Sequence, residues 1–173
     1  MNTLQEDAQG GRSESANPVS DYLKAVHDEA SVQRLAAEFA RLARPPIVLF
    51  LHGDLGAGKT TFARAFIHSL GYEGYVKSPS YGLLESYRAG GRNILHLDLY
   101  RIEDPEELDF LALRDLFDAD TVLLVEWPDK GRFHLPPADL RMVFDEGDTA
   151  RTIGWSGLTD AGRNLARDVW ENL

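Results

Sequence analysis

The feature that most constrains this 173-residue chain is a glycine-rich segment directly after a short apolar run. Residues 47–51 read IVLFL, and residues 53–60 read GDLGAGKT, which fits the pattern G-x-x-x-x-G-K-[ST]. A helical spacing of apolar residues begins straight afterwards and continues to about Gly71. A buried strand, a glycine-rich loop and a helix form the context in which this pattern binds phosphate. The sequence therefore predicts a phosphate-binding loop rather than an accidental glycine-rich turn.

The residue types in the loop agree with that chemistry. Gly53, Gly56 and Gly58 allow backbone conformations and a close approach to phosphate that a Cβ atom would prevent. Because the loop opens a helix, free N–H groups and the positive end of the helix dipole face the anion. Lys59 adds a charge for the β- and γ-phosphates, and the Thr60 hydroxyl suits Mg²⁺. The residues predicted to bind the nucleotide here are Gly53, Asp54, Leu55, Gly56, Ala57, Gly58, Lys59, Thr60 and Thr61.

Composition limits the class of protein. A hydrophobic content of 43% and a charged content of 27% are typical of a globular chain, and this length favours one domain. The longest apolar run has five residues, too few to span a membrane, and the N-terminus lacks the apolar core of a signal peptide. There is no cysteine, which excludes disulfides and thiolate metal sites and suits the reducing cytoplasm. We therefore predict a cytoplasmic protein, with residues 1–20 as a disordered polar tail and residues 21–173 as a single domain.

The net charge of −10 argues against unaided binding of nucleic acid, which depends on Lys and Arg. The acid is unevenly distributed, since residues 98–129 hold eleven Asp and Glu against two Arg. A solvated surface and a docking surface for a basic partner both fit this excess.

Hydrophobic periodicity predicts an alternation of strands and helices. Strands are expected at residues 21–26, 47–51, 83–88, 93–100, 121–127, 140–145 and 150–155, the last two joined by a turn at residues 146–148. Four helices are expected. The first runs from residue 27 or 28 to just before Pro45, the second follows the glycine-rich loop, and the others lie at residues 105–117 and 159–173. In the last helix, the residues expected to face inward are Ala161, Leu165, Ala166, Val169 and Leu173.

Two of these strands end in a carboxylate. Asp98 follows the apolar run at 94–97, and Glu126 follows the run at 122–125. Strand ends of this kind lie where a doubly wound fold binds phosphates, so one acid could contact Mg²⁺ and the other could orient an attacking water. Capping of the next element is the alternative for either acid alone.

The loop at residues 72–82 fits neither period and lies where nucleotide-sensing switch segments occur. Its Ser78-Pro79-Ser80 offers hydroxyls to a γ-phosphate or to the water around a metal ion, or else simply forms a turn. The five histidines show no metal-ligand spacing, so we interpret them as structural. Trp127 fits either a core position or a wall of the site.

Five blocks together resemble the bacterial TsaE (YjeE) ATPases, which support threonylcarbamoyladenosine modification of tRNA. They are GDLGAGKTT at 53–61, VKSPSY at 76–81, HLDLYR at 96–101, PEEL at 105–108 and VEWP at 125–128. The phosphate loop is shared by many families, whereas HxDLYR and VEWP at these separations are far more specific. The resemblance covers about residue 28 to the C-terminus.

The resemblance implies an α/β P-loop NTPase fold with three layers and a mixed parallel and antiparallel central sheet. It also implies ATP and Mg²⁺ as ligands, weak intrinsic hydrolysis, and an accessory role for the TsaD–TsaB transferase complex, which carries the tRNA. On this reading Thr60 and Glu126 hold Mg²⁺, and Asp98 serves hydrolysis or the metal's water shell. Lys59 and Ser80 would assist catalysis, with residues 76–81 as the switch, and Glu29 would lie near the nucleotide base. The family commonly has Thr at the position of Ser80 and a hydroxyl residue at that of Gly82, so this chain keeps a hydroxyl at the first position and lacks one at the second.

The leading alternative is a small-molecule kinase on the same scaffold. Such kinases usually close an Arg-bearing lid over the acceptor. After Glu126 the arginines are scattered and form no lid-like run. A GTPase is disfavoured because no N-K-x-D tetrapeptide occurs. A nucleotide-gated binding module, in which the ATP-bound state rather than turnover matters, is a third alternative.

Overall fold

The computed structural model describes residues 20–147 and 150–173. Apart from Ser20, the predicted N-terminal tail lies outside the described residues, as does Asp148 in the predicted turn. Among the described helices, none combines the length and the apolar character needed to cross a membrane.

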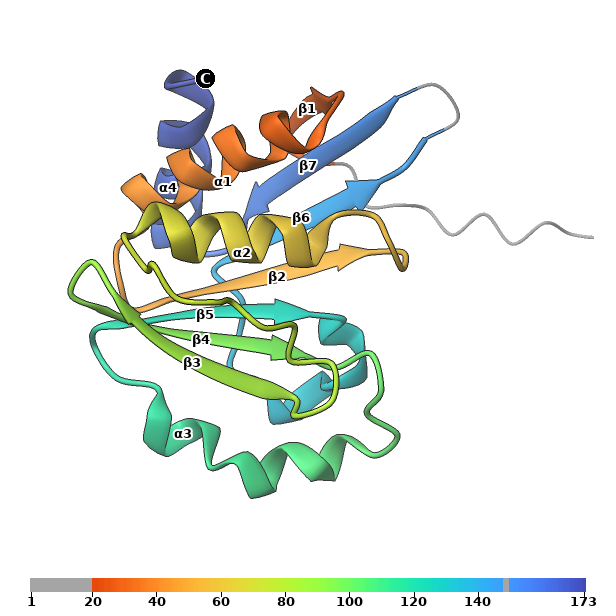
Figure 1. Ribbon diagram of the computed structural model, residues 1–173, viewed down its shortest axis with the longest axis vertical. Helices are drawn as coiled ribbons and strands as arrows, with labels where there is room; N and C mark the ends of the chain where they lie inside the picture. The colour runs from red at the N-terminus through yellow and green to blue at the C-terminus, as the bar shows by residue number, and fades with distance from the viewer. Residues whose placement is uncertain (1–19, 148–149) are drawn as a thin grey trace, which may run out of the picture.

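A seven-stranded mixed sheet forms the centre of the molecule, in the order β1-β7-β6-β2-β5-β4-β3 (Figure 1). The strands are β1 (Tyr22–Val26), β2 (Ile47–Gly53), β3 (Leu84–Ala89), β4 (Arg92–Asp98), β5 (Thr121–Glu126), β6 (Leu140–Asp145) and β7 (Arg151–Gly157). Strand β2 runs parallel to β5 and β6, and β4 runs parallel to β5, whereas the outer pairs are antiparallel. All seven predicted strands are therefore confirmed, with ends that differ by at most two residues.

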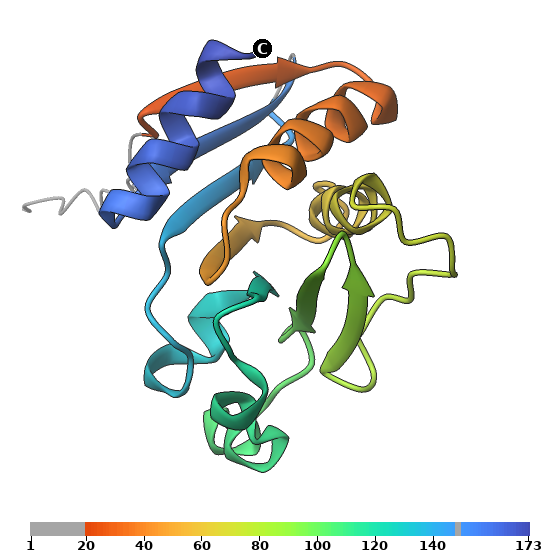
Figure 2. The ribbon, with the colours of Figure 1, turned by 90° about the vertical axis from the view of Figure 1, so that its left-hand side faces the viewer.

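One face of the sheet is covered by α1 (Glu29–Leu42) and α2 (Lys59–Ser69), with α4 (Asp160–Glu171) beside them (Figures 1 and 2). Helix α1 starts where predicted, because the Asp28 carboxylate accepts a hydrogen bond from the Ser31 backbone N–H at 2.7 Å. Helices α1 and α2 pack together, and Phe39 of α1 lies edge-on to Phe62 of α2. Burial of these rings fixes α2, and with it the glycine-rich loop, over the central strand β2.

The other face is covered by short helical segments that lie at the far end of the molecule from α4 (Figures 1 and 2). They are the 3-10 helices η1 (Pro105–Leu111), η2 (Pro128–Lys130) and η3 (Arg132–His134) and the single turn α3 (Leu113–Leu116). With a helical layer on each face of the sheet, the predicted three-layer α/β architecture is confirmed.

The predicted single helix at 105–117 is instead two segments, the 3-10 helix η1 and the single turn α3, separated at Ala112, which has a left-handed φ of +47°. Its start is as predicted, with Asp104 and Glu107 forming a capping box. The buried side chains Leu108 and Leu113 explain the break. They are five positions apart, about 140° around an ideal α-helix, so one continuous helix would not turn both toward the sheet.

The inward face predicted for the last helix also needs correction. Leu165, Ala166 and Val169 are buried, but Ala161 and Leu173 are exposed, and Gly162 is buried in their place. The helix approaches Asp139 so closely that a Cβ atom on Gly162 would lie 1.7 Å from the Asp139 carbonyl oxygen. Leu173 lies beyond the last helical residue, Glu171, and so does not share the helix face.

Candidate functional site

The glycine-rich loop joins β2 to α2 and has the backbone that its sequence predicts. Gly53, Gly56 and Gly58 all have positive φ angles, of 142°, 87° and 105°. Gly53 has a second constraint, because a Cβ atom there would lie 2.4 Å from the Phe144 carbonyl oxygen. Nothing lies within 4 Å of the Cβ position of Gly56 or Gly58, so side chains there would project into the space beside the loop. Because the first N–H groups of a helix have no acceptor within the helix, the loop presents hydrogen-bond donors at the start of α2.

Lys59 is buried beneath this loop, with 4% of its surface exposed. Its ammonium donates hydrogen bonds to the carbonyls of Gly53 at 2.6 Å and Asp54 at 2.7 Å. It also lies 4.3 Å from the centre of the Trp127 ring. Burial lowers the pKa of Lys59, while the nearby carboxylates of Glu126, Asp98 and Asp54 oppose that shift.

Trp127 is a wall of the site and is also half-buried against the core on the face covered by the short helical segments. Its φ of +57° ends β5 and turns the chain into η2, and its ring also packs against Tyr100. The sequence left this position open, because an aromatic residue after a buried strand suits either environment.

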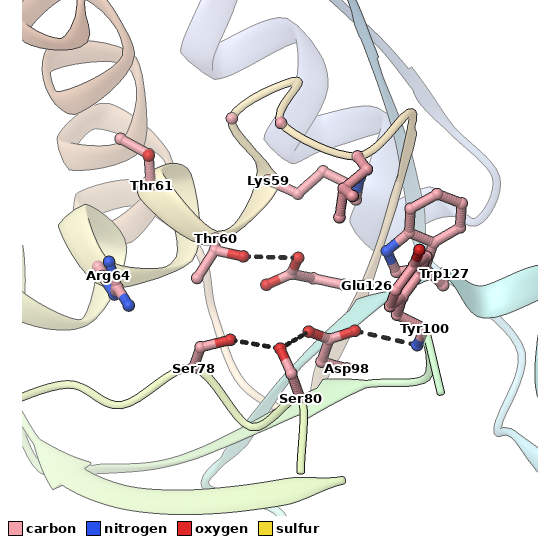
Figure 3. Close-up of a pocket in the computed structure, with 13 residues that line it drawn as sticks. Lys59, Thr60, Thr61, Arg64, Ser78, Ser80, Asp98, Tyr100, Glu126 and Trp127 are labelled. Atoms are coloured by element: carbon pink, nitrogen blue, oxygen red, sulfur yellow. Dashed lines mark hydrogen bonds between the residues drawn. The ribbon is translucent and has the colours of Figure 1, made fainter. Parts of the chain in front are cut away.

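Asp98 and Glu126 lie next to each other at the ends of the parallel strands β4 and β5 (Figure 3). Both are nearly fully buried. The Glu126 Oε2 atom accepts a hydrogen bond of 2.9 Å from the Thr60 hydroxyl of α2. Its Oε1 atom lies 2.8 Å from His96 Nε2. The sequence led us to interpret the histidines as structural, and it did not indicate this contact of His96.

Asp98 instead connects to the loop at residues 72–82, which forms neither helix nor strand, as predicted. Its Oδ2 atom accepts a hydrogen bond of 2.6 Å from the Ser80 hydroxyl, which lies 2.6 Å from the hydroxyl of Ser78 (Figure 3). Its Oδ1 atom accepts from the Tyr100 backbone N–H at 3.0 Å. The two serines thus face the ends of the strands.

A pocket of about 340 Å³ lies between these elements. Its lining combines part of the glycine-rich loop with residues from α2, the 72–82 loop and the two strand ends: Leu55, Gly56, Gly58, Lys59, Thr60, Thr61, Arg64, Ser78, Ser80, Asp98, Tyr100, Glu126 and Trp127. Gly53, Asp54 and Ala57 do not line it, although Gly53 and Asp54 supply the carbonyls that hold Lys59.

Glu29 lies apart from this pocket, in a neighbouring one of about 420 Å³. The two pockets share Thr61 and Arg64, so they adjoin along one side of α2. The Glu29 carboxylate accepts a hydrogen bond from Gln33 at 3.0 Å.

Sequence reasoning missed Arg64, which lines both pockets. Within the described part of the chain its side chain makes no hydrogen bond or ion pair, and its Nε atom is buried. A partly buried guanidinium in this position is suited to an anionic group. Its position in the sequence, four residues after Thr60 on the helix that the loop opens, was the signal available.

The oxygen atoms of Thr60 and Glu126 are of the hard type that Mg²⁺ prefers. No group of three or more His, Cys, Asp or Glu that could hold a metal ion occurs among the described residues. Mg²⁺ keeps several water molecules when bound to proteins, so a hydroxyl and one carboxylate fit it without such a group.

Comparison with known proteins agrees with this geometry. Residues 26–153 match the family described as threonylcarbamoyl adenosine biosynthesis protein TsaE. The chain belongs to the TsaE family. The Haemophilus influenzae TsaE protein is 43% identical over 145 residues, which cover 81% of this chain and 92% of that protein. The Bacillus subtilis TsaE protein is 38% identical over 140 residues, covering 80% and 85%.

The fold is also that of a solved relative. The crystal structure of Bacillus subtilis YdiB superimposes with a TM-score of 0.74 at 29% sequence identity, covering 87% of this chain and 95% of YdiB. The P-loop NTPase fold expected from the sequence is therefore confirmed for this TsaE-family chain.

Proposed function

We propose that this chain is a weak, Mg²⁺-dependent ATPase that assists the TsaD–TsaB transferase complex in threonylcarbamoyladenosine modification of tRNA. Membership of the TsaE family supports the pathway. The observation that carries the ATPase proposal is the 2.9 Å hydrogen bond between Thr60 and Glu126, directly beside Lys59 in the glycine-rich loop. This juxtaposition supplies a phosphate cradle and a pair of hard oxygen ligands in one pocket.

In this proposal the loop residues 53–61 bind the triphosphate through backbone N–H groups and the Lys59 ammonium. Thr60 and Glu126 hold Mg²⁺, which when bound neutralises charge on the phosphate oxygens. Arg64 contacts an anionic group of ATP between the two adjoining pockets, and Glu29 approaches the base. The shared lining of the two pockets supports an extended ligand along α2.

Asp98 is proposed to orient the attacking water or the water shell of the metal. Its carboxylate accepts a hydrogen bond from Ser80 at 2.6 Å, so a change in the conformation of the 72–82 loop would change the hydrogen bonding of Asp98. If the Ser80 hydroxyl turns toward a γ-phosphate, Asp98 Oδ2 becomes free to accept a hydrogen bond from water. Lys59, Asp98 and Ser80 are thus the proposed catalytic residues.

The proposed contact with the transferase is an acidic face, defined by the exposed carboxylates of Glu103, Asp104, Glu106, Glu107, Asp109 and Asp115. Two very exposed aromatic side chains adjoin it, Phe110 at 88% and Phe133 at 98%. A 3.0 Å contact between Asp109 and His134 holds η1, which carries Phe110, against η3, which carries Phe133. Exposed aromatic residues within a charged rim are typical of protein interfaces. The partner expected here is a basic protein surface.

The tRNA is proposed to be reached only through the transferase, because a chain of net charge −10 has little capacity to neutralise phosphates. Cytoplasmic tRNA modification makes the cytoplasm the proposed location. A small-molecule kinase remains the alternative, and it predicts phosphate transfer to an acceptor other than water.

The test is phosphate release from ATP by the purified protein, alone and with the transferase pair and tRNA. We expect slow release alone and faster release with the complex, and no release from either in EDTA. Absence of hydrolysis under all conditions, or transfer of phosphate to a small acceptor, contradicts the proposal.

Docking is tested separately by affinity capture of the transferase pair with Glu106→Lys and Phe133→Ser. The matched control is Glu171→Lys, an exposed acidic residue of α4 at the opposite end of the molecule (Figure 1). We expect capture to fall for the first two variants and to be unaffected in the control. Undiminished capture by both would exclude the acidic face.

A further inference from the structure

His96 is a buried polar residue of β4, on the strand face that carries the core residue Ile94 before it and the site residue Asp98 after it. Its side chain is fully buried, with 0% of its surface exposed. On the same face, Ile94 precedes it and belongs to the core beneath α1 and α2, together with Val122 and Leu124 of β5. Its one hydrogen-bond contact within the described residues is with Glu126 Oε1, at 2.8 Å, and its Nδ1 atom is buried without a partner.

This environment does not account for a histidine through packing alone. An apolar side chain would fill the same space without burying an unpaired nitrogen. What histidine provides here, and an apolar residue cannot, is an N–H group directed at the Glu126 carboxylate. A carboxylate that binds a cation accepts hydrogen bonds and donates none, so the contact requires a proton on His96 Nε2. That assignment agrees with the lack of an acceptor at Nδ1.

The two carboxylate oxygens of Glu126 therefore contact different partners. Oε1 is held from the sheet side by His96, and Oε2 faces the Thr60 hydroxyl at the start of α2. Carboxylates that bind metals are commonly held by such a hydrogen bond from behind, which fixes the orientation of the ligating oxygen.

We propose that His96 is a positioning residue, which holds the Glu126 carboxylate in the orientation that shares a divalent cation with Thr60. This inference rests on the proposed Mg²⁺-ATP function. Without the Nε2–H donor, Oε1 is buried and unpaired, and the carboxylate is free to turn away from Thr60. The expected effect is on the cation and not on the nucleotide itself, because His96 does not line the pocket.

The experiment measures ATP affinity by calorimetry in EDTA and over a series of Mg²⁺ concentrations. For His96→Leu we expect the Mg²⁺ needed for half-maximal effect to rise by about 10- to 100-fold, with the affinity in EDTA unchanged. His96→Gln, which keeps an N–H donor of similar reach, should recover most of the wild-type Mg²⁺ dependence. The matched control is His134→Leu, which removes a histidine–carboxylate pair of 3.0 Å outside the pocket and should leave the dependence unchanged.

An unchanged Mg²⁺ dependence in folded His96→Leu overturns the inference. An equal loss of affinity in EDTA also overturns it, since that result indicates a purely structural role. If the wild-type protein itself binds no Mg²⁺-ATP, the proposed function fails instead, and the two failures are thereby distinguished.

A second measurement covers the case in which His96→Leu does not fold. NMR of the wild-type protein with ¹⁵N-labelled histidine reports which ring nitrogen of His96 is protonated. We expect a protonated Nε2 whose resonance shifts when Mg²⁺ is added to the ATP-bound protein. A ring protonated only at Nδ1, or a resonance unaffected by Mg²⁺, contradicts the inference.

Discussion

Asp98 and Glu126 are register partners at the ends of the parallel strands β4 and β5, yet each accepts a hydrogen bond from a different element of the site. Asp98 accepts a hydrogen bond from Ser80 of the 72–82 loop, and Glu126 accepts one from Thr60 at the start of α2. Two adjacent carboxylates with separate partners are suited to separate roles, and we expect Glu126 to act on the metal and Asp98 to act on hydrolysis.

Glu126→Gln is expected to bind ATP in EDTA as tightly as the wild type does. In Mg²⁺ its affinity for ATP should be lower than that of the wild type by at least about tenfold. The amide retains a carbonyl oxygen but lacks the negative charge that a divalent cation requires. Titration of ATP with and without Mg²⁺ measures both quantities. A variant that responds to Mg²⁺ like the wild type would remove Glu126 from the metal site.

Asp98→Asn should leave binding of Mg²⁺-ATP nearly unchanged and reduce partner-stimulated phosphate release by about 10²- to 10⁴-fold. The reason is that the amide replaces one of the two accepting carboxylate oxygens with an N–H donor and removes the negative charge that orients the water. The check is single-turnover phosphate release with the transferase pair and tRNA present. Full turnover by Asp98→Asn would exclude the proposed role of this residue.

Ser80→Ala removes the hydroxyl that contacts Asp98, whereas Ser80→Thr keeps it. We expect phosphate release to fall in Ser80→Ala and to stay near the wild-type level in Ser80→Thr. Equal rates in the alanine and threonine variants would show that this hydroxyl has no part in turnover.

Gly162→Ala should destabilise the fold by about 1–3 kcal/mol or more, because its Cβ atom would overlap the Asp139 carbonyl oxygen. The matched control is Gly82→Ala, where nothing lies within 4 Å of the Cβ position and φ is ordinary. Urea unfolding of the two variants gives the free energies, and the control should stay within about 0.5 kcal/mol of wild type. Equal stabilities would mean that α4 shifts freely away from Asp139.

Much of this arrangement follows from local sequence. The loop, Lys59 and Thr60 are contiguous, and Asp98 and Glu126 each end an apolar run, so short-range pattern was enough to predict that they meet. The prediction that Ser80 lies near this site also agrees with the structure.

What the sequence did not provide depends on packing between distant segments. His96 and Glu126 are 30 residues apart, and only the register of β4 with β5 brings them into contact. The close approach of Gly162 to Asp139 and the break at Ala112 depend on how helices meet the sheet, which periodicity within one segment does not encode. The inward prediction for Ala161 fails for that reason, whereas the one for Leu173 fails because the helix ends at Glu171.

The affinity for ATP should begin to fall at a lower pH than it would if Lys59 had the pKa of an ordinary lysine. Burial lowers the pKa of Lys59 from its usual value of 10.5. In the proposed site the charged form of Lys59 binds phosphate, so affinity should be complete below the lowered pKa and decline as pH rises through it. Calorimetry over a series of alkaline pH values below 10.5 measures this decline. Affinity that stays constant up to the usual pKa would contradict the shift, and Lys59→Ala should show no slope.

The most direct test of the phosphate cradle is the affinity of folded Lys59→Ala for ATP at neutral pH. Loss of one charge-assisted contact should weaken binding by about 1.5–3 kcal/mol, or roughly 10- to 150-fold. Circular dichroism and thermal unfolding establish that the variant is folded. Affinity equal to that of the wild type would contradict the assignment of residues 53–61 as the nucleotide-binding loop, and the account of the site would fail with it.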